Sequence, residues 1–444
     1  MLDEASGAEA RLEITSVQRL NAGAVDPLVR YAVDGPKPGA TSDLHDFTLA
    51  GWALHPERSI TAIQVVAYGE TIGWGRVQIG RPDVAQAFPN VPQAMTAGFH
   101  FTAGVVGLPV DFECDVEACL DDGRRVPLAR LEGRRSPVVV DDGEYLRPLL
   151  VTSLGRSGST YLMGLLAGHP GIVTDRAVPY ETRTSAYWTQ VFKVLSRPAN
   201  YSRAGDPDTF VYNRHFVGQN PFYFARRGEP GAVRAWYGQT TVERLADFCR
   251  ATIDSFYRMT ARLNGQDNPR YYAEKRLESA VIDPWLDLYR GGREIFLVRD
   301  FRDTLASILA FNAKRGYQAF GRENAGSDEE YVGVLQSSAR AFYEAWKRRG
   351  TMESLVRYED LAASPREALP RILDHLGLDS SETIIDDMIA RVESAAELRE
   401  HRTTESATSS IGRWQTDLDD GLKAACDEAF GGILAELGYA VPAT

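Results

Sequence analysis

The sequence predicts two folded parts: a small all-β sandwich followed by an α/β domain built on a parallel sheet with flanking helices. Short strand-like segments with alternating apolar residues fill residues 43–135. After residue 148, strand and helix patterns alternate, as they do in parallel α/β folds. We therefore expect an N-terminal segment at 1–42, the sandwich at 43–135, a linker at 136–147 and the α/β domain at 148–444.

The composition is that of a globular protein, because 44% of the 444 residues are hydrophobic and 25% are charged. The net charge is −12 and falls mostly on residues 1–145, which argues against nucleic acid or an anionic membrane as partner. The first residues lack the apolar core of a signal peptide, and no apolar run approaches membrane-spanning length. The four cysteines lack zinc-type spacing, so we expect reduced thiols in a cytoplasmic protein.

The sandwich prediction rests on strands at 47–54 and 60–67 and on hairpin turns at 68–70 and 121–123. The run Gly-Trp-Ala-Leu-His-Pro at 51–56, with the later Gly-Arg-Pro-Asp-Val and Gly-Phe-His-Phe runs, resembles a β-sandwich module attached to bacterial glycosyltransferases and related glycan enzymes. This resemblance implies a spacer or packing module, or alternatively glycan binding, and no catalytic residues.

The most informative stretch is the strand, loop and helix of residues 149–170. Its loop reads Gly155-Arg156-Ser157-Gly158-Ser159-Thr160. Two glycines let the backbone approach a ligand, and the start of the helix offers N–H groups and partial positive charge. The guanidinium and three hydroxyls add donors, so the loop predicts an anion site, most simply for phosphate. The alternative is an ordinary strand–helix turn. The Lys of a nucleotide-triphosphate loop is missing.

This loop resembles the 5′-phosphosulfate loop of sulfotransferases, which use 3′-phosphoadenosine 5′-phosphosulfate (PAPS). A second segment agrees: an apolar strand ends at Arg299, and Ser307 follows eight residues later in a helix. That arrangement resembles the family's 3′-phosphate motif, in which a guanidinium and a hydroxyl clamp a phosphate. The resemblance covers roughly residues 147–440 and implies a P-loop-type parallel sheet with its ligand at the carboxyl ends of the strands.

Two later segments extend the resemblance. Tyr358 begins a Tyr-Glu-Asp segment whose Tyr lies near the adenine in the family. We expect its strand to run over 355–361, and a capping box at 364–367 to start the next helix. The run Ser-Ser-Ile-Gly-Arg-Trp resembles the family's late loop over the nucleotide, which would give Ser410, Gly412 and Arg413 a part in cofactor binding. Serines replace the family's basic doublet there.

The resemblance also implies roles in catalysis. Arg156 would neutralise the leaving 5′-phosphate, and Lys275 would reach the transferred sulfuryl group or the nucleotide. Glu181 stands where carbohydrate-type sulfotransferases carry the base carboxylate. Its alternative is a surface glutamate, and His169 or Glu274 would then be the next candidates, although Glu274 could instead pair with Lys275. We expect no metal, since side chains supply the positive charge.

The interpretation that follows is a PAPS-dependent sulfotransferase that acts on a hydroxyl of a carbohydrate or glycolipid. A small natural product or peptidyl tyrosine is the alternative acceptor. An adaptor that binds nucleotide or glycan without turnover is the alternative of another class, and a P-loop kinase the other enzyme. Residues 182–270 read as irregular and rich in aromatics, typical of a lid over the acceptor or of a helical subdomain.

Overall fold

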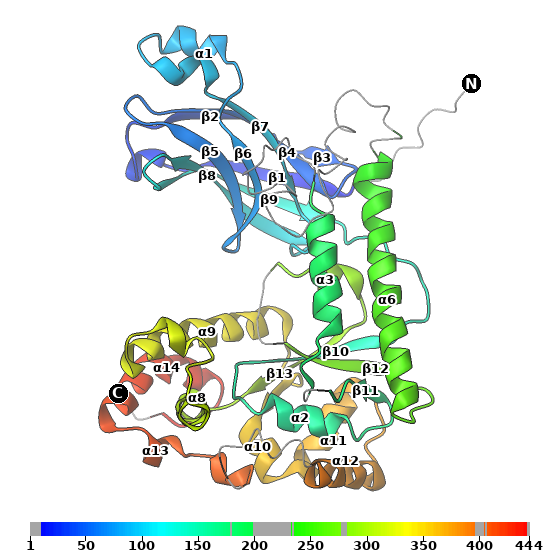
Figure 1. Cartoon of the computed structure of the whole chain (residues 1–444). Helices are drawn as coiled ribbons and strands as arrows, with labels where there is room; N and C mark the ends of the chain where they lie inside the picture. The colour runs from blue at the N-terminus through cyan, green and yellow to red at the C-terminus, as the bar shows by residue number, and fades with distance from the viewer. Residues whose placement is uncertain are drawn as a thin grey trace, which may run out of the picture. The chain divides into compact units, whose positions relative to one another are not determined.

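The computed structural model describes residues 10–177, 180–198, 232, 235–276, 282–395, 404 and 406–441. Contacts divide the chain into two compact units (Figure 1). The first comprises Met1–Gly143, Trp188–Arg250 and Val281–Leu288, and the second comprises Glu144–Tyr187, Ala251–Ala280 and Tyr289–Thr444. In the described part of the chain, no helix is both long and apolar enough to cross a membrane.

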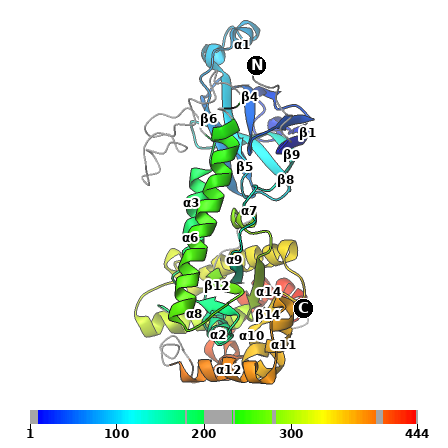
Figure 2. The same ribbon diagram turned by 90° about the vertical axis from the view of Figure 1, so that its right-hand side faces the viewer.

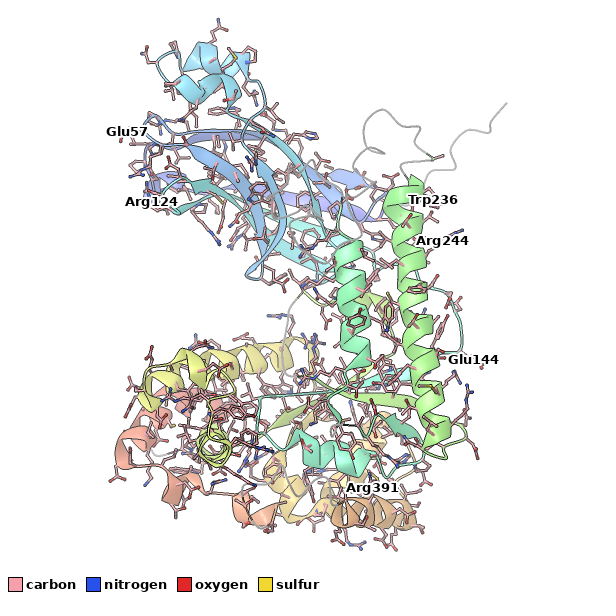
Figure 3. All side chains as sticks on the ribbon, in the orientation of Figure 1. Glu57, Arg124, Glu144, Trp236, Arg244 and Arg391 are labelled. Atoms are coloured by element: carbon pink, nitrogen blue, oxygen red, sulfur yellow. The ribbon has the colours of Figure 1, made fainter. Side chains whose placement is uncertain are left out.

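The first unit contains an antiparallel sandwich. A six-stranded sheet has the order β3-β1-β9-β8-β5-β6, and a three-stranded sheet has the order β2-β4-β7. The strands are β1 (Leu12–Arg19), β2 (Arg30–Gly35), β3 (Ala40–Ser42), β4 (Asp46–Leu54), β5 (Ile60–Ala67), β6 (Glu70–Arg76), β7 (Gly98–Gly104), β8 (Asp111–Leu120) and β9 (Arg125–Arg135). Apolar side chains from both sheets form one core between them (Figure 3).

The expected strands at 47–54 and 60–67 are confirmed as β4 and β5. The segment at 1–42 was expected to precede the sandwich, but β1, β2 and β3 lie within it and pair with sandwich strands. The prediction missed β2 and β3 because they bury little apolar surface and so show no clear alternation.

A segment from much later in the chain also belongs to the first unit. Its short helix α7 (Trp285–Leu288) carries Asp287, which is fully buried and forms an ion pair of 2.7 Å with the buried guanidinium of Arg135. The same carboxylate accepts hydrogen bonds from the backbone N–H groups of Gly107 at 2.6 Å and Val138 at 3.1 Å. A buried carboxylate needs this number of partners to offset its lost hydration.

The second unit is built on a parallel sheet, as predicted, and its five strands have the order β11-β12-β10-β13-β14. The strands are β10 (Arg147–Ser153), β11 (Ile172–Thr174), β12 (Tyr271–Arg276), β13 (Arg293–Val298) and β14 (Leu355–Arg357). Along β13, Ile295 and Leu297 enter one core, whereas Phe296 and Val298 enter another. Both faces of the sheet are therefore covered, which explains why its strands read as continuous apolar runs.

Each core lies between one face of the sheet and the helices that pack on that face (Figure 2). One core takes residues from α2 (Ser159–Leu166), α10 (Tyr358–Ala363), α11 (Pro365–Leu376) and α12 (Glu382–Ser394). The other takes residues from α8 (Phe301–Arg315), α9 (Asp328–Arg349) and α14 (Asp420–Glu436). Gly377 ends α11 in the left-handed region with φ of 63°.

Two local predictions were wrong. The strand expected at 355–361 ends at Arg357, and Tyr358 starts α10. Ser364 precedes α11 but makes no side-chain capping bond, so the capping box is absent. Residues 182–270 had two interpretations, and the helices α3 (Thr184–Leu195) and α6 (Thr241–Leu263) agree with the helical one. Residues 199–231 of the expected lid lie outside the described residues.

Candidate functional site

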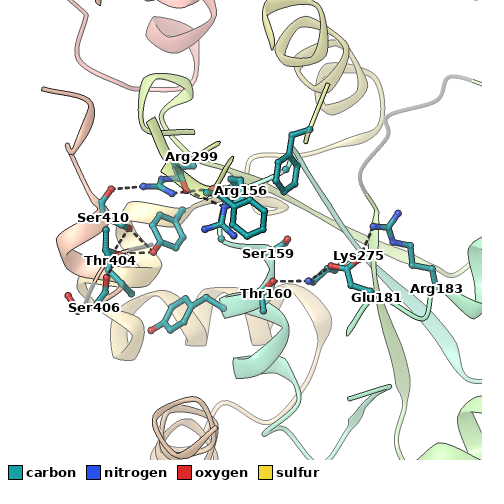
Figure 4. A pocket seen from close by; sticks show the side chains of 18 residues that line it. Arg156, Ser159, Thr160, Glu181, Arg183, Lys275, Arg299, Thr404, Ser406 and Ser410 are labelled. Atoms are coloured by element: carbon teal, nitrogen blue, oxygen red, sulfur yellow. Dashed lines mark hydrogen bonds and ion pairs between the residues drawn. The ribbon is translucent and has the colours of Figure 1, made fainter. Parts of the chain in front are cut away.

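A cavity of about 350 Å³ lies in the second unit, at the carboxyl ends of β10, β12 and β13. Parallel strands bring the residues that follow them to the same edge of the sheet, so segments far apart in sequence meet here. Its lining comes from the glycine loop, the end of β12, α8 and the loop behind it, Tyr358, and the segment 404–410 (Figure 4). The lining residues are Gly155, Arg156, Gly158, Ser159, Thr160, Tyr161, Glu181, Arg183, Lys275, Arg299, Ser307, Phe311, Phe320, Tyr358, Thr404, Ser406, Ala407 and Ser410.

Both glycines of the loop are required by close packing. Gly158 has φ of +90°, and a Cβ there would lie 2.2 Å from the ring of Tyr358. A Cβ on Gly155 would lie 2.5 Å from the ring of Phe320. The helix α2 then starts at Ser159 without a side-chain cap. Ser157 is buried and does not line the cavity, unlike Ser159 and Thr160.

Arg156 belongs to the glycine loop, and its side chain contacts α8. Its backbone adopts φ of 65°, in the left-handed region that a non-glycine residue rarely adopts. Its Nε donates to Oγ of Ser307 at 3.3 Å, and the guanidinium lies 4.7 Å from the ring centre of Phe311. Burial, with the nearby charges of Arg299 and Arg413, lowers the pKa of Arg156 to about 10. The side chain is therefore still a cation at neutral pH.

Arg299 follows β13 and is buried, with 4% of its surface exposed. Its guanidinium donates to the backbone carbonyls of Arg156, at 3.1 Å, and Ser410, and it lies 4.9 Å from the ring centre of Tyr358. Its Nε is buried and has no hydrogen-bond partner among the described residues. The expected pair of Arg299 and Ser307 thus lines one cavity, although the Ser307 hydroxyl contacts Arg156.

The late loop reaches the cavity through Ser410, whose Oγ lies 3.0 Å from the Tyr358 hydroxyl. Gly412 and Arg413 were also expected at the nucleotide, but neither lines the cavity. Arg413 forms an ion pair with Asp417, and the N–H of Gly412 donates to Asp303 at 2.7 Å. The difference arises because α13 (Trp414–Asp417) starts directly after Arg413 and supplies its carboxylate partner.

The sequence reasoning missed Asp303. This buried residue in the first turn of α8 accepts from the N–H groups of Gly412 and Trp414, at 2.7 and 2.9 Å. Burial raises the pKa of Asp303, against the opposing effect of these hydrogen bonds and of Arg299. Arg302 adds a contact, with its guanidinium 4.1 Å from the ring centre of Trp414. The partners of Asp303 lie more than a hundred residues away along the chain. The sequence alone therefore shows only an acidic residue at the start of a helix.

On the other side of the glycine loop, Lys275 and Glu181 form an ion pair. Nζ of Lys275 lies 2.8 Å from Oε1 of Glu181 and donates to Oγ1 of Thr160 at 2.8 Å. Arg183, which the sequence reasoning missed, donates to the second oxygen of Glu181 at 2.8 Å. Figure 4 shows Thr160, Lys275, Glu181 and Arg183 as one chain of contacts.

The pKa values of this pair follow from burial and charge. Burial acts to raise the pKa of Glu181, but the hydrogen bonds and charges of Lys275 and Arg183 outweigh it and lower that pKa. Burial lowers the pKa of Lys275, although Glu181 opposes the shift. Glu181 is therefore ionised at neutral pH, and Lys275 gives up its proton more readily than an exposed lysine.

Glu274 and His169 lie away from the cavity. Glu274 does not pair with Lys275, because consecutive residues of a strand point to opposite faces. It accepts instead from Ser185 and from the Tyr257 hydroxyl. His169 accepts from the N–H of Gly171 at 2.9 Å, and its Nε2 lies 3.0 Å from the carbonyl of Asp379, so it holds the turn that follows α2.

Residues 148–382 match the family model of the sulfotransferase family, and this match covers more than half of the chain. The chain therefore belongs to the sulfotransferase family. No curated protein gives a significant match.

Proposed function

We propose that this member of the sulfotransferase family transfers the sulfuryl group of PAPS to a hydroxyl group of an acceptor. One observation carries the proposal: a single cavity is lined by the glycine loop, by the cations Arg156, Lys275 and Arg299, and by the carboxylate of Glu181. A donor with several negative charges requires such cations, and an acceptor hydroxyl requires a base. Sulfuryl transfer resembles phosphoryl transfer, in which positioning and charge stabilisation supply most of the rate.

The donor fits the residues present. Arg299 offers a buried Nε without a partner among the described residues, beside the Tyr358 ring, and would hold the 3′-phosphate. Tyr358 and Ser410 would border the adenosine, since they meet at the same end of the cavity. The loop from Gly155 to Thr160 would hold the 5′-phosphosulfate through its N–H groups and hydroxyls.

Two cations, Arg156 and Lys275, would flank the transferred group. When bound, PAPS supplies a sulfuryl group attached to its 5′-phosphate. Arg156 would neutralise the charge that builds on this phosphate, and Lys275 would contact the moving group. Glu181 would accept the acceptor's proton as the acceptor oxygen bonds to sulfur, because its carboxylate is ionised at neutral pH and lines the same cavity as the two cations.

We further propose a carbohydrate or glycolipid acceptor, rather than a small natural product or peptidyl tyrosine. The support is the resemblance of the N-terminal sandwich to modules of bacterial glycan enzymes. The cysteines support a cytoplasmic location, because all four are free thiols. Burial raises the pKa of Cys114, Cys249 and Cys426 to about 12, which keeps these thiols protonated.

The proposal is tested by incubating the full chain with PAPS and a host extract and searching by mass spectrometry for molecules that gain one SO₃ group. A gain that requires the enzyme is expected on glycans or glycolipids, whereas a gain on tyrosyl peptides would replace the proposed acceptor. Adenosine 3′,5′-bisphosphate at 100 times its Kd should add about 2.7 kcal/mol to the unfolding free energy. Equal stabilisation by ATP with magnesium would favour a kinase.

The residue roles have their own tests. Arg299→Ala should weaken binding of adenosine 3′,5′-bisphosphate by about 1.5–3 kcal/mol and leave an analogue without the 3′-phosphate unaffected. Glu181→Gln should lower kcat by about 10²–10⁴ and leave nucleotide binding unchanged. Full activity of Glu181→Gln would place the base elsewhere, and absence of turnover in the wild type would favour the adaptor.

A further inference from the structure

The short connection that carries Glu181 has an uncommon backbone. Tyr180 and Arg183, on either side of it, have φ of 67° and 45°, and neither is a glycine. Such a backbone conformation is unfavourable for a residue other than glycine and persists only where the surrounding structure holds it. The contacts that hold this connection therefore bear on the position of the Glu181 carboxylate.

On the C-terminal side of this connection, the contacts are made to the buried carboxylate of Glu274. Ser185, in the first turn of α3, donates from its backbone N–H to Oε1 of Glu274 at 2.6 Å and from its hydroxyl to Oε2 at 2.6 Å. The Tyr257 hydroxyl donates to the same carboxylate, and its ring stacks on Tyr272 with 4.3 Å between ring centres. Ser185, Tyr257 and Glu274 are all less than 5% exposed, so water does not compete for these bonds.

Strand β12 thus contacts this connection from both of its faces. Lys275 points into the cavity and pairs with Glu181, whereas Glu274 points the opposite way and binds Ser185, four residues after Glu181. We propose that Glu274 and Ser185 are positioning residues that hold residues 180–185 so that the Glu181 carboxylate stays in the cavity beside Lys275. The inference rests on the proposed function, in which Glu181 is the base.

A positioning role explains the buried carboxylate of Glu274 better than a purely structural role does. Burial raises the pKa of Glu274, although the bonds from Ser185 and Tyr257 oppose the shift. An ionised group in such a site costs stability unless all of its partners are in place. The two oxygens of the carboxylate accept from four donors, the N–H and hydroxyl of Ser185, the N–H of Ala186 and the Tyr257 hydroxyl, and three of these donors lie at the start of α3.

The test variant is Ser185→Ala, which removes one hydrogen bond and keeps the backbone N–H. We expect kcat to fall by about 10- to 100-fold, the range for a catalytic group displaced by up to about 1 Å. The Kd of adenosine 3′,5′-bisphosphate should not change. Glu274→Gln should act in the same direction. The matched control is Glu294→Gln on the neighbouring strand β13, where the carboxylate accepts from Arg349 and Thr152. This control should lower the Tm without lowering kcat.

A double-mutant cycle separates positioning from general damage. If Ser185 acts through Glu181, adding Ser185→Ala to Glu181→Gln should lower kcat no further. The pH profile gives a second readout, since Lys275 and Arg183 face Glu181, and Arg156 is the next cation beside Lys275. Loosening these contacts in Ser185→Ala should move the acid limb of kcat/KM to higher pH.

Wild-type kcat and an unmoved acid limb in Ser185→Ala would overturn the inference while leaving Glu181 as the base. An equal loss of kcat in both backgrounds would also overturn it. If Glu274→Gln fails to fold, Ser185→Ala and the double-mutant cycle still test whether Ser185 positions Glu181. Full activity of Glu181→Gln alone would instead overturn the proposed base, and the inference with it.

Discussion

The guanidinium of Arg156 contacts the Ser307 hydroxyl and the Phe311 ring in the cavity, and these contacts fix its position. Arg156→Ala should lower kcat by about 10²–10³, the usual effect of removing one group that stabilises charge in the transition state. The measurement is kcat with saturating donor and acceptor. The control is Arg315→Ala, which removes a cation from the same Phe311 ring outside the cavity lining. Equal losses in both variants would contradict the assigned role.

The pH dependence follows from the two cations on Glu181. Because they lower its pKa, activity should persist below the ordinary range of a glutamate and be lost as pH falls through that lowered pKa. The alkaline limb should begin below the ordinary lysine value of 10.5, since burial lowers the pKa of Lys275.

Arg183→Ala tests this assignment, because removing one cation should raise the pKa of Glu181 and move the acid limb of kcat/KM to higher pH. Glu181→Gln should abolish that limb in either background. An acid limb that stays in place when Arg183 is removed would show that another group sets it.

At the scale of elements, Asp303 joins α8 to the late loop through the N–H groups of Gly412 and Trp414. Asp303→Ala should weaken binding of adenosine 3′,5′-bisphosphate by roughly 1–3 kcal/mol, because the loop that carries Ser410 loses two hydrogen bonds to a charged acceptor. Isothermal titration measures this change.

Asp419→Ala is the control for Asp303, since Asp419 caps α14 by accepting from Leu422 at 2.8 Å and lies outside the cavity lining. It should cost about 1 kcal/mol of stability and no nucleotide affinity. If both variants bind the bisphosphate as tightly as the wild type, the late loop does not need its attachment to α8.

At the scale of the whole molecule, the chain offers two ion pairs on adjacent arginines of β9. Arg135 pairs with Asp287 at 3% and 0% side-chain exposure, whereas Arg134 pairs with Asp111 at 68% and 70%. Asp287→Asn should lower the unfolding free energy of the first unit by about 3–5 kcal/mol, because it leaves the Arg135 charge buried and unpaired.

The matched variant Asp111→Asn should leave denaturant unfolding unchanged, since an ion pair exposed to this extent is screened by solvent. Equal midpoints for the two variants would show that residues 282–288 are dispensable for the sandwich. A chain cut after residue 135 would lose Asp287 altogether, so the sequence-based end of the sandwich omits part of its core.

The sequence by itself determined the features that depend on neighbouring residues. Short apolar segments predicted β4 and β5, and continuous apolar runs predicted β10 and β13, because burial on one or both faces of a sheet imposes these patterns. The glycine loop and the segment from Arg299 to Ser307 were recognisable for the same reason: each carries its chemistry within a few residues.

Only the tertiary structure decided which distant groups meet. Lys275 lies 94 residues from Glu181, Ser410 is 111 residues from Arg299, and Asp287 is 152 residues from Arg135. No periodicity encodes such partners, since they depend on strand order and on which face each side chain takes. The same limit led us to consider Glu274 as a partner of Lys275, and it concealed Asp303, whose contacts exist only once the fold brings α8 and the late loop together.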